Sequence, residues 1–135
     1  MKYLLILIAL SFSLQAASIE AFADKMHYET NYEKAMEKAK KEKKLVMLVM
    51  VTHYCPWCRK YERDTLSKKS ISKLVKEKYI PLVLNREDRK FPKKFDTERI
   101  PITMFIDPKS ETLIYKEMGY KIKKEFLDME AKVKP

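Results

Sequence analysis

The chain contains two cysteines, and both lie in one short segment. Cys55 and Cys58 are separated by two residues in VTHYCPWCRKYE, between a run of seven apolar residues and a segment with helical features. Such a pair can form a structural disulfide, supply part of a metal site or act as a redox centre. Closing so short a loop removes little chain entropy, so stabilisation explains the pair poorly.

A metal site at the two cysteines would need further ligands. Zinc is commonly bound by two cysteine pairs or by cysteines together with histidines. Besides Cys55 and Cys58, the sequence offers only His27 and His53 as soft or imidazole ligands of this kind. We therefore expect neither a metal nor an organic cofactor.

The redox interpretation follows from the residues around the pair. Pro56 suits the first turn of a helix, which would place Cys55 at the helix start. Free N–H groups and the helix dipole stabilise a thiolate there, and Arg59 and Lys60 add positive charge. Because the thiolate is the nucleophile in disulfide exchange, Cys55 is predicted to attack, and the more buried Cys58 to resolve the mixed disulfide.

Helices and strands are predicted to alternate around this site. A capping box, with Thr30 as N-cap and Glu33 three residues later, begins a helix. The apolar run after it suits a strand buried on both faces. Pro81 favours an edge strand, and Pro108 a hairpin turn. The predicted helices cover 31–43, 56–66, 70–78 and 122–133, and the predicted strands cover 45–51, 80–85, 102–107 and 112–117.

Composition indicates one globular α/β domain. The chain has 135 residues, of which 46% are hydrophobic and 36% charged, and its single glycine argues against Gly-rich phosphate loops. The net charge of +10 comes mostly from dispersed lysines. Without an arginine-rich arm or an aromatic-interleaved basic stripe, this pattern predicts a lysine-rich surface and no nucleic-acid partner.

The N-terminus has the pattern of a signal peptide. Lys2 precedes an apolar run too short for a membrane span, and Ala21-Phe22-Ala23 forms a small-x-small cleavage site. Cutting after Ala16 or Ala17 also fits, and an uncleaved anchor is the alternative. The prediction is a removed leader over 1–23, a single domain over 24–135, and a periplasmic, oxidising location.

The motifs together resemble the thioredoxin superfamily. Cys55-Pro56-Trp57-Cys58 stands at a strand–helix junction, Ile100-Pro101 precedes a later strand, and Gly119 comes before the final helix. The chain is most similar, over about 28–133, to exported thioredoxin-like thiol–disulfide oxidoreductases and to the C-terminal domain of the periplasmic electron carrier DsbD. The resemblance implies a thioredoxin fold, in which helices flank a central mixed sheet of about four strands.

The resemblance also implies roles for residues around the cysteines. Pro101 would be a cis-proline beside them, and the backbone of Ile100 would pair with a bound substrate strand. Trp57 would face outward and contact substrate.

Four further positions bear on the chemistry. Tyr54 replaces the tryptophan that thioredoxin has before its first cysteine, and Val49 replaces its buried aspartate. Glu62 matches a glutamate of the DsbD domain and would take over part of the proton handling, or else it is a solvated helix residue. His53 either tunes Cys55 through its charge or is an ordinary loop residue.

The expected function is therefore disulfide exchange with exported proteins that carry cysteine pairs. A membrane-bound or soluble thiol carrier would be the redox partner, and we expect a monomer. The resemblance favours a reductase or electron relay over an isomerase, whereas the positive surroundings of Cys55 favour a more oxidising potential. The rival hypothesis is a thioredoxin-fold binding module, either a chaperone or a metal carrier, without redox turnover.

Overall fold

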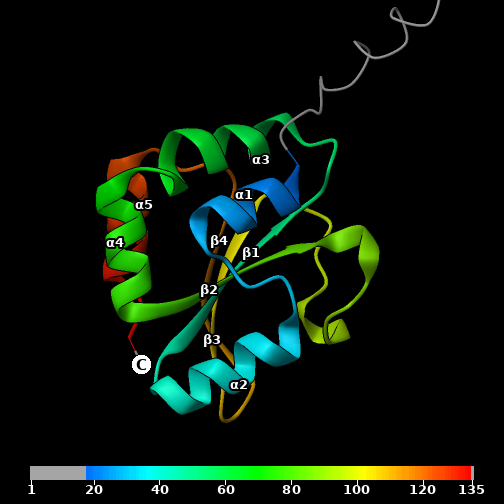
Figure 1. The fold of residues 1–135 in the computed structure, drawn as a ribbon, viewed down its shortest axis with the longest axis vertical. Helices are drawn as coiled ribbons and strands as arrows, with labels where there is room; N and C mark the ends of the chain where they lie inside the picture. Colours follow the sequence, from blue (N-terminus) through cyan, green and yellow to red (C-terminus); the bar gives the residue numbers. More distant parts are fainter. Residues whose placement is uncertain (1–17, 135) are drawn as a thin grey trace, which may run out of the picture.

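The computed structural model describes residues 18–134, which form a four-stranded mixed sheet between helices (Figure 1). The strand order is β2-β1-β3-β4. β1 pairs in parallel with β2 and antiparallel with β3, and β3 pairs antiparallel with β4. The strands are β1 (Leu45–Val51), β2 (Tyr79–Asn85), β3 (Ile102–Asp107) and β4 (Thr112–Met118). The predicted α/β class and four-stranded sheet are confirmed.

The central strand β1 is buried on both faces, as its apolar run predicts. Successive side chains of a strand point to opposite faces. Val46, Leu48 and Met50 accordingly belong to the apolar cluster under α2 (Tyr32–Glu42). Met47 and Val49 belong to the cluster on the opposite face. The helices whose residues fill that second cluster are α1 (Ile19–Met26), α3 (Pro56–Tyr61), α4 (Lys69–Lys78) and α5 (Lys123–Ala131).

Short helical segments connect these elements. α3 runs directly into the π-helix η1 (Glu62–Leu66), and the 3-10 helices η2 (Arg86–Asp88) and η3 (Lys93–Phe95) lie between β2 and β3. α4 and α5 lie side by side at the left of Figure 1, where Lys78 pairs with Glu130.

β2 is an edge strand, as Pro81 predicts. Proline lacks the N–H that a central strand would need. The segment before α2 partly covers this edge: Glu29 donates its N–H to the Pro81 carbonyl at 2.8 Å and accepts from the Val83 N–H at 2.9 Å. The sheet therefore exposes less unpaired backbone along β2.

The start of α2 differs from the prediction by one residue. Asn31, rather than Thr30, is the N-cap, because its side-chain oxygen accepts from the Lys34 N–H at 2.9 Å. Asparagine is at least as strong an N-cap as threonine. The exposed Thr30 stays outside the helix.

An N-terminal helix was not predicted. α1 begins after Ser18, whose hydroxyl accepts from the Ala21 N–H at 3.0 Å, and it buries Ile19, Phe22 and Ala23 in the core. The predicted leader boundary after Ala23 thus falls inside a packed helix, and residues 1–17 of that leader lie outside the described residues. No helix within 18–134 has the length and apolarity needed to cross a membrane.

Candidate active site

The two cysteines form a disulfide at the start of α3. Cys55 is the N-cap residue, Pro56 follows in the first turn, and the two Cα atoms are 5.1 Å apart. The Cys58 N–H donates to the Cys55 sulfur at 3.1 Å. The side chain of Cys55 is 8% exposed, and Cys58 is completely buried. Solvent therefore reaches Cys55 first, and a helix N–H already points at its sulfur.

Glu62 lies on the buried side of the helical segment that follows. It stands four residues after Cys58, and this spacing places both on one helix face. Its side chain is only 5% exposed, so the alternative of a solvated helix residue is wrong. Tyr61, Thr65 and Leu66 are also buried.

Arg59 is the partner of the buried Glu62 carboxylate. An Nε–Oε2 distance of 2.7 Å and a hydrogen bond from Nη2 to Oε1 at 2.9 Å join the two side chains. Burial raises the pKa of Glu62 from 4.5 to about 7, although Arg59 acts in the opposite direction. Arg59 also donates to the His53 carbonyl at 3.4 Å. Its charge is therefore used mainly by Glu62 rather than left free beside Cys55.

Lys60 is also engaged by a carboxylate. Its ammonium donates to Asp64 at 2.8 Å and lies 5.4 Å from the centre of the Tyr120 ring. Hydrogen bonds from Arg63 and Lys60 lower the pKa of Asp64 to about 2. Both cations predicted to activate Cys55 thus have ion-pair partners, which leaves the helix start as the main source of positive potential at its sulfur.

Val49 is fully buried in the same apolar cluster as Cys58. Its partner across the β1–β3 ladder is Thr103, whose hydroxyl hydrogen-bonds the Tyr61 hydroxyl at 2.9 Å. The position at which thioredoxin has its buried aspartate therefore carries no ionisable group. Two acidic residues are buried within residues 18–134, Glu62 and Glu130. Glu130 pairs with Lys78, and Glu62 is the one that stands on the helical segment of the cysteines.

The Ile100–Pro101 peptide bond is cis, as the resemblance implies. Pro101 is buried directly before β3, and Ile102 pairs with Met50 near the end of β1 that leads to Cys55. Ile100 is half-buried and packs against both apolar clusters. The sheet thus brings this proline to the same end of the molecule as the disulfide.

Exposed apolar side chains gather at this end. Trp57 is 58% exposed and packs against Tyr120, with ring centres 5.7 Å apart. The loop carrying Tyr120 is held by Gly119, which donates to the Pro101 carbonyl at 2.7 Å. Sequence analysis missed Tyr120, although an aromatic residue directly after the only glycine was a visible signal. We call Tyr54, Trp57, Met118, Tyr120 and Ile122, all exposed or partly so, the apolar rim.

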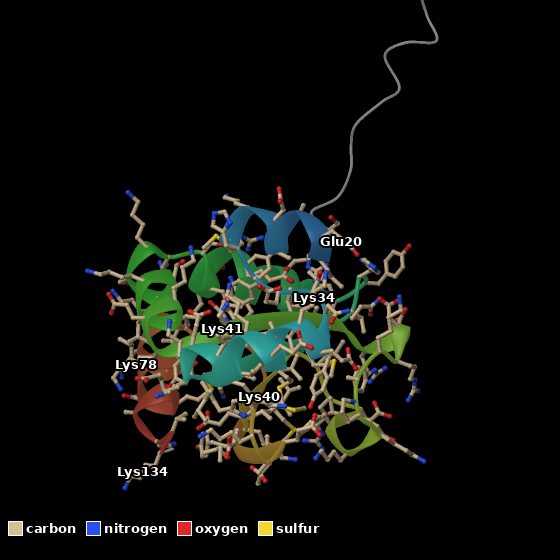
Figure 2. The ribbon with its side chains drawn as sticks, turned by 60° about the horizontal axis from the view of Figure 1, so that its bottom comes forward. Glu20, Lys34, Lys40, Lys41, Lys78 and Lys134 are labelled. Atoms are coloured by element: carbon tan, nitrogen blue, oxygen red, sulfur yellow. A yellow bond between two sulfur atoms is a disulfide. The ribbon has the colours of Figure 1, made fainter. Side chains whose placement is uncertain are left out.

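His53 contacts the unpredicted helix α1. Its Nε2 atom is 4.0 Å from a carboxylate oxygen of Glu20, which projects from α1 in Figure 2. A leader predicted over 1–23 leaves no helix that could supply this neighbour. Within residues 18–134, no three histidine, cysteine or acidic side chains cluster closely enough to hold a metal ion.

Comparisons with known proteins agree with this geometry. A family model described as thioredoxin-like matches residues 27–108. Among solved structures, a thioredoxin from Thermus thermophilus superposes with a TM-score of 0.65 at 20% identity, covering 75% of this chain and 82% of that one. The oxidised C-terminal domain of DsbD from Neisseria meningitidis gives 0.63 at 16% identity, covering 78% and 99%. These superpositions establish a thioredoxin fold.

One curated relative matches over a shorter segment. Spermatogenesis-associated protein 20 of Mus musculus is 33% identical over 57 residues. The matched segment makes up 42% of this chain but only 7% of that protein. The similarity therefore concerns one small part of a much longer chain.

Proposed function

Because the chain belongs to the thioredoxin-like family, we propose that it is a thiol–disulfide oxidoreductase that works through Cys55 and Cys58. The observation that carries this proposal is the asymmetry of the pair. Cys55 is the more exposed residue of the two and its sulfur accepts a helix N–H, whereas Cys58 is completely buried one turn further along. An attacking thiol and a resolving thiol need these two environments.

In the reducing direction, the Cys55 thiolate attacks one sulfur of a substrate disulfide. The substrate S–S bond breaks, a mixed disulfide forms, and the first substrate sulfur leaves as a thiolate. The Cys58 thiol then loses its proton and attacks the Cys55 sulfur, which releases the second substrate thiol. The substrate gains two electrons and two protons, and the chain returns to the Cys55–Cys58 disulfide. The oxidising direction is the exact reverse.

Glu62 is suited to accept the proton of Cys58. Its carboxyl is buried on the same helix face as Cys58, and burial raises its pKa to about 7. A group with a pKa near the working pH exchanges protons most effectively in either direction. Arg59 keeps the carboxylate form accessible by pairing with it at 2.7 Å. This arrangement would replace the buried aspartate that Val49 excludes.

The apolar rim is suited to bind the substrate around its disulfide. Trp57 and Tyr120 offer a large aromatic surface whose rings already pack against each other, so little side-chain freedom is lost on binding. Ile100 and Pro101 lie at the same end of the sheet, where an extended substrate strand would pair with the backbone of Ile100. We assign the substrate class as unfolded or extended polypeptides with a cysteine pair near apolar residues.

We place the protein in the periplasm, where it would exchange disulfides with exported proteins. The N-terminal pattern of Lys2 and the following apolar run supports export. The described packing of α1 supports a cut after Ala16 or Ala17, which would leave Ile19 and Phe22 in the core. We expect a reductase or electron relay that a membrane or soluble thiol partner reduces again. The ion pairs of Arg59 and Lys60 support this role, because positive charge left free beside Cys55 would favour a more oxidising potential.

Catalysed reduction of insulin by dithiothreitol tests the activity. The wild-type chain should accelerate it, and Cys55→Ser should remove the acceleration. A matched control, Thr52→Ser, changes a buried residue of the same loop without touching either sulfur. If the double Cys55→Ser, Cys58→Ser variant kept full function in the cell, the binding-module hypothesis would replace this one. The equilibrium reduction potential, measured against glutathione, then decides the direction of electron flow.

A further inference from the structure

A cavity lies at the end of the sheet opposite the disulfide. Its volume is about 550 Å³, within the range of small-molecule sites. Leu45 and Tyr79, the first residues of β1 and β2, line it, and so does the turn after β3. β1 enters the sheet here and reaches the redox site only at its other end. Figure 2 looks at this face, on which the labelled Lys40, Lys41, Lys78 and Lys134 are spread over α2, α4 and the C-terminal segment.

The inner wall of the cavity is apolar and comes from several elements. Ala39 on α2 is completely buried, and Leu45 and Ile114 on β1 and β4 are half-buried. Val133, just after α5, completes this wall. Because four separate elements build it, the wall is fixed by the fold itself rather than by one mobile loop.

The rim of the cavity is cationic. Five lysines line it against two carboxylates, Asp107 and Glu130. Both carboxylates already have partners: Glu130 accepts from Lys78 at 2.9 Å and from the Tyr79 hydroxyl at 2.8 Å. Asp107 accepts from the Lys109 N–H at 2.9 Å and the Ser110 hydroxyl at 3.0 Å. Glu130 is thus held by Lys78, whereas the partners of Asp107 are uncharged and leave its negative charge on the rim. Five lysines against two carboxylates still give the rim an excess of positive charge.

Three rim lysines have no ion pair among residues 18–134. They are Lys40, Lys43 and Lys109, whereas Lys44 donates to the Lys76 carbonyl at 2.8 Å. Lysines near a helix C-terminus interact favourably with the helix dipole, which explains why Lys40 and Lys43 occur at the end of α2. The dipole does not explain the presence of Lys109, which lies in the β3–β4 turn and lines the same cavity.

We propose that this cavity binds a small organic anion with an apolar chain or ring and a single carboxylate. The apolar body would cover the half-buried Leu45, Ile114 and Val133, and the carboxylate would meet Lys40, Lys43 and Lys109. The complementarity of charge and apolarity carries this assignment, because an apolar floor without the unpaired lysines would not select an anion. The site is separate from the disulfide and does not depend on the redox activity.

Calorimetric titration with decanoate tests the proposal. Decanoate should bind, and decanol, which has the same chain but no charge to meet the three lysines, should bind about tenfold more weakly. The triple variant Lys40→Gln, Lys43→Gln, Lys109→Gln should weaken decanoate binding by a similar factor. The control triple Lys69→Gln, Lys73→Gln, Lys90→Gln removes equal charge from lysines that do not line the cavity and should bind like wild type.

Several outcomes would overturn the proposal. Equal losses in both triple variants would show that only bulk charge attracts the anion. Equal binding of decanol would show an unselective apolar surface. Binding of anionic phospholipid vesicles that depends on the same three lysines, without binding of free decanoate, would reassign the face to a membrane contact. Amide chemical shifts, which should change at Ala39 and Ile114 but not at Trp57, give an independent readout of location.

Discussion

Replacing Glu62 by glutamine is expected to change how the stability of the oxidised protein depends on pH. The pKa of Glu62 is about 7 in the folded chain, against a value of 4.5 without burial. The folded state therefore favours the protonated carboxyl. The stability associated with that proton is fully present below about pH 4.5 and is lost as the pH rises through about 7. Glutamine at this position has no such dependence.

The size of the effect follows from the pKa difference. At roughly 1.4 kcal/mol per pKa unit, the difference between 4.5 and about 7 gives an upper limit of about 3.5 kcal/mol. Residual solvent around the Arg59 pair screens part of this, so we expect about 2 kcal/mol. The free energy of unfolding of wild type should accordingly fall by about 2 kcal/mol more than that of Glu62→Gln between pH 4.5 and pH 8.5.

Urea denaturation followed by circular dichroism at a series of pH values measures this difference. The other ionisable groups are common to both proteins, so their contributions cancel in the comparison. Glu77→Gln, an exposed helical glutamate, is the matched control and should keep the wild-type pH dependence. In Arg59→Gln the loss should move to higher pH, because Arg59 lowers the pKa of Glu62. Parallel curves for wild type and Glu62→Gln would refute the reasoning.

Three further predictions concern the site and the N-terminus. Cys58→Ala should accumulate mixed disulfides with exported proteins, visible on non-reducing gels, whereas Cys55→Ala should not; equal trapping by both would reverse the assigned roles. Trp57→Ala should lower kcat/KM for a peptide disulfide severalfold while leaving Tm nearly unchanged, because the ring is 58% exposed; a large drop in Tm would instead make Trp57 a core residue. Mass spectrometry of the protein purified from the cell envelope should find cleavage after Ala16 or Ala17; cleavage after Ala23, which would remove two large apolar side chains worth roughly 4 kcal/mol of burial, would show that α1 is dispensable.

Much of the scaffold could be predicted from local patterns. The apolar run at 45–51 predicts a buried strand with the observed bounds, since both faces of that strand must avoid water. Pro81 predicts an edge strand, because its missing N–H cannot serve a central one. Pro56 after Cys55 predicts the helix start and, with it, which cysteine is more exposed. These features depend on chemistry within a few residues.

The environment of Glu62 needed the tertiary structure. The four-residue spacing predicts that Glu62 lies on the same helix face as Cys58. The local sequence does not show whether that part of the face is buried or solvated. Whether Glu62 is buried depends on which other elements pack against that helix face. Its carboxylate can be buried because the rotamer of Arg59 places the guanidinium 2.7 Å from it. The raised pKa is a property of that packing.

The order of the residues already places two cysteines at a helix start, a proline before a strand, and a strand pattern that supports them. Which distant residues join this site follows from the packing of the whole core, which brings Tyr120 against Trp57 and Glu20 of α1 near His53. Local preferences arise from backbone geometry and neighbouring side chains. Contacts between residues far apart in the chain arise only when the whole core packs, so no short pattern specifies them.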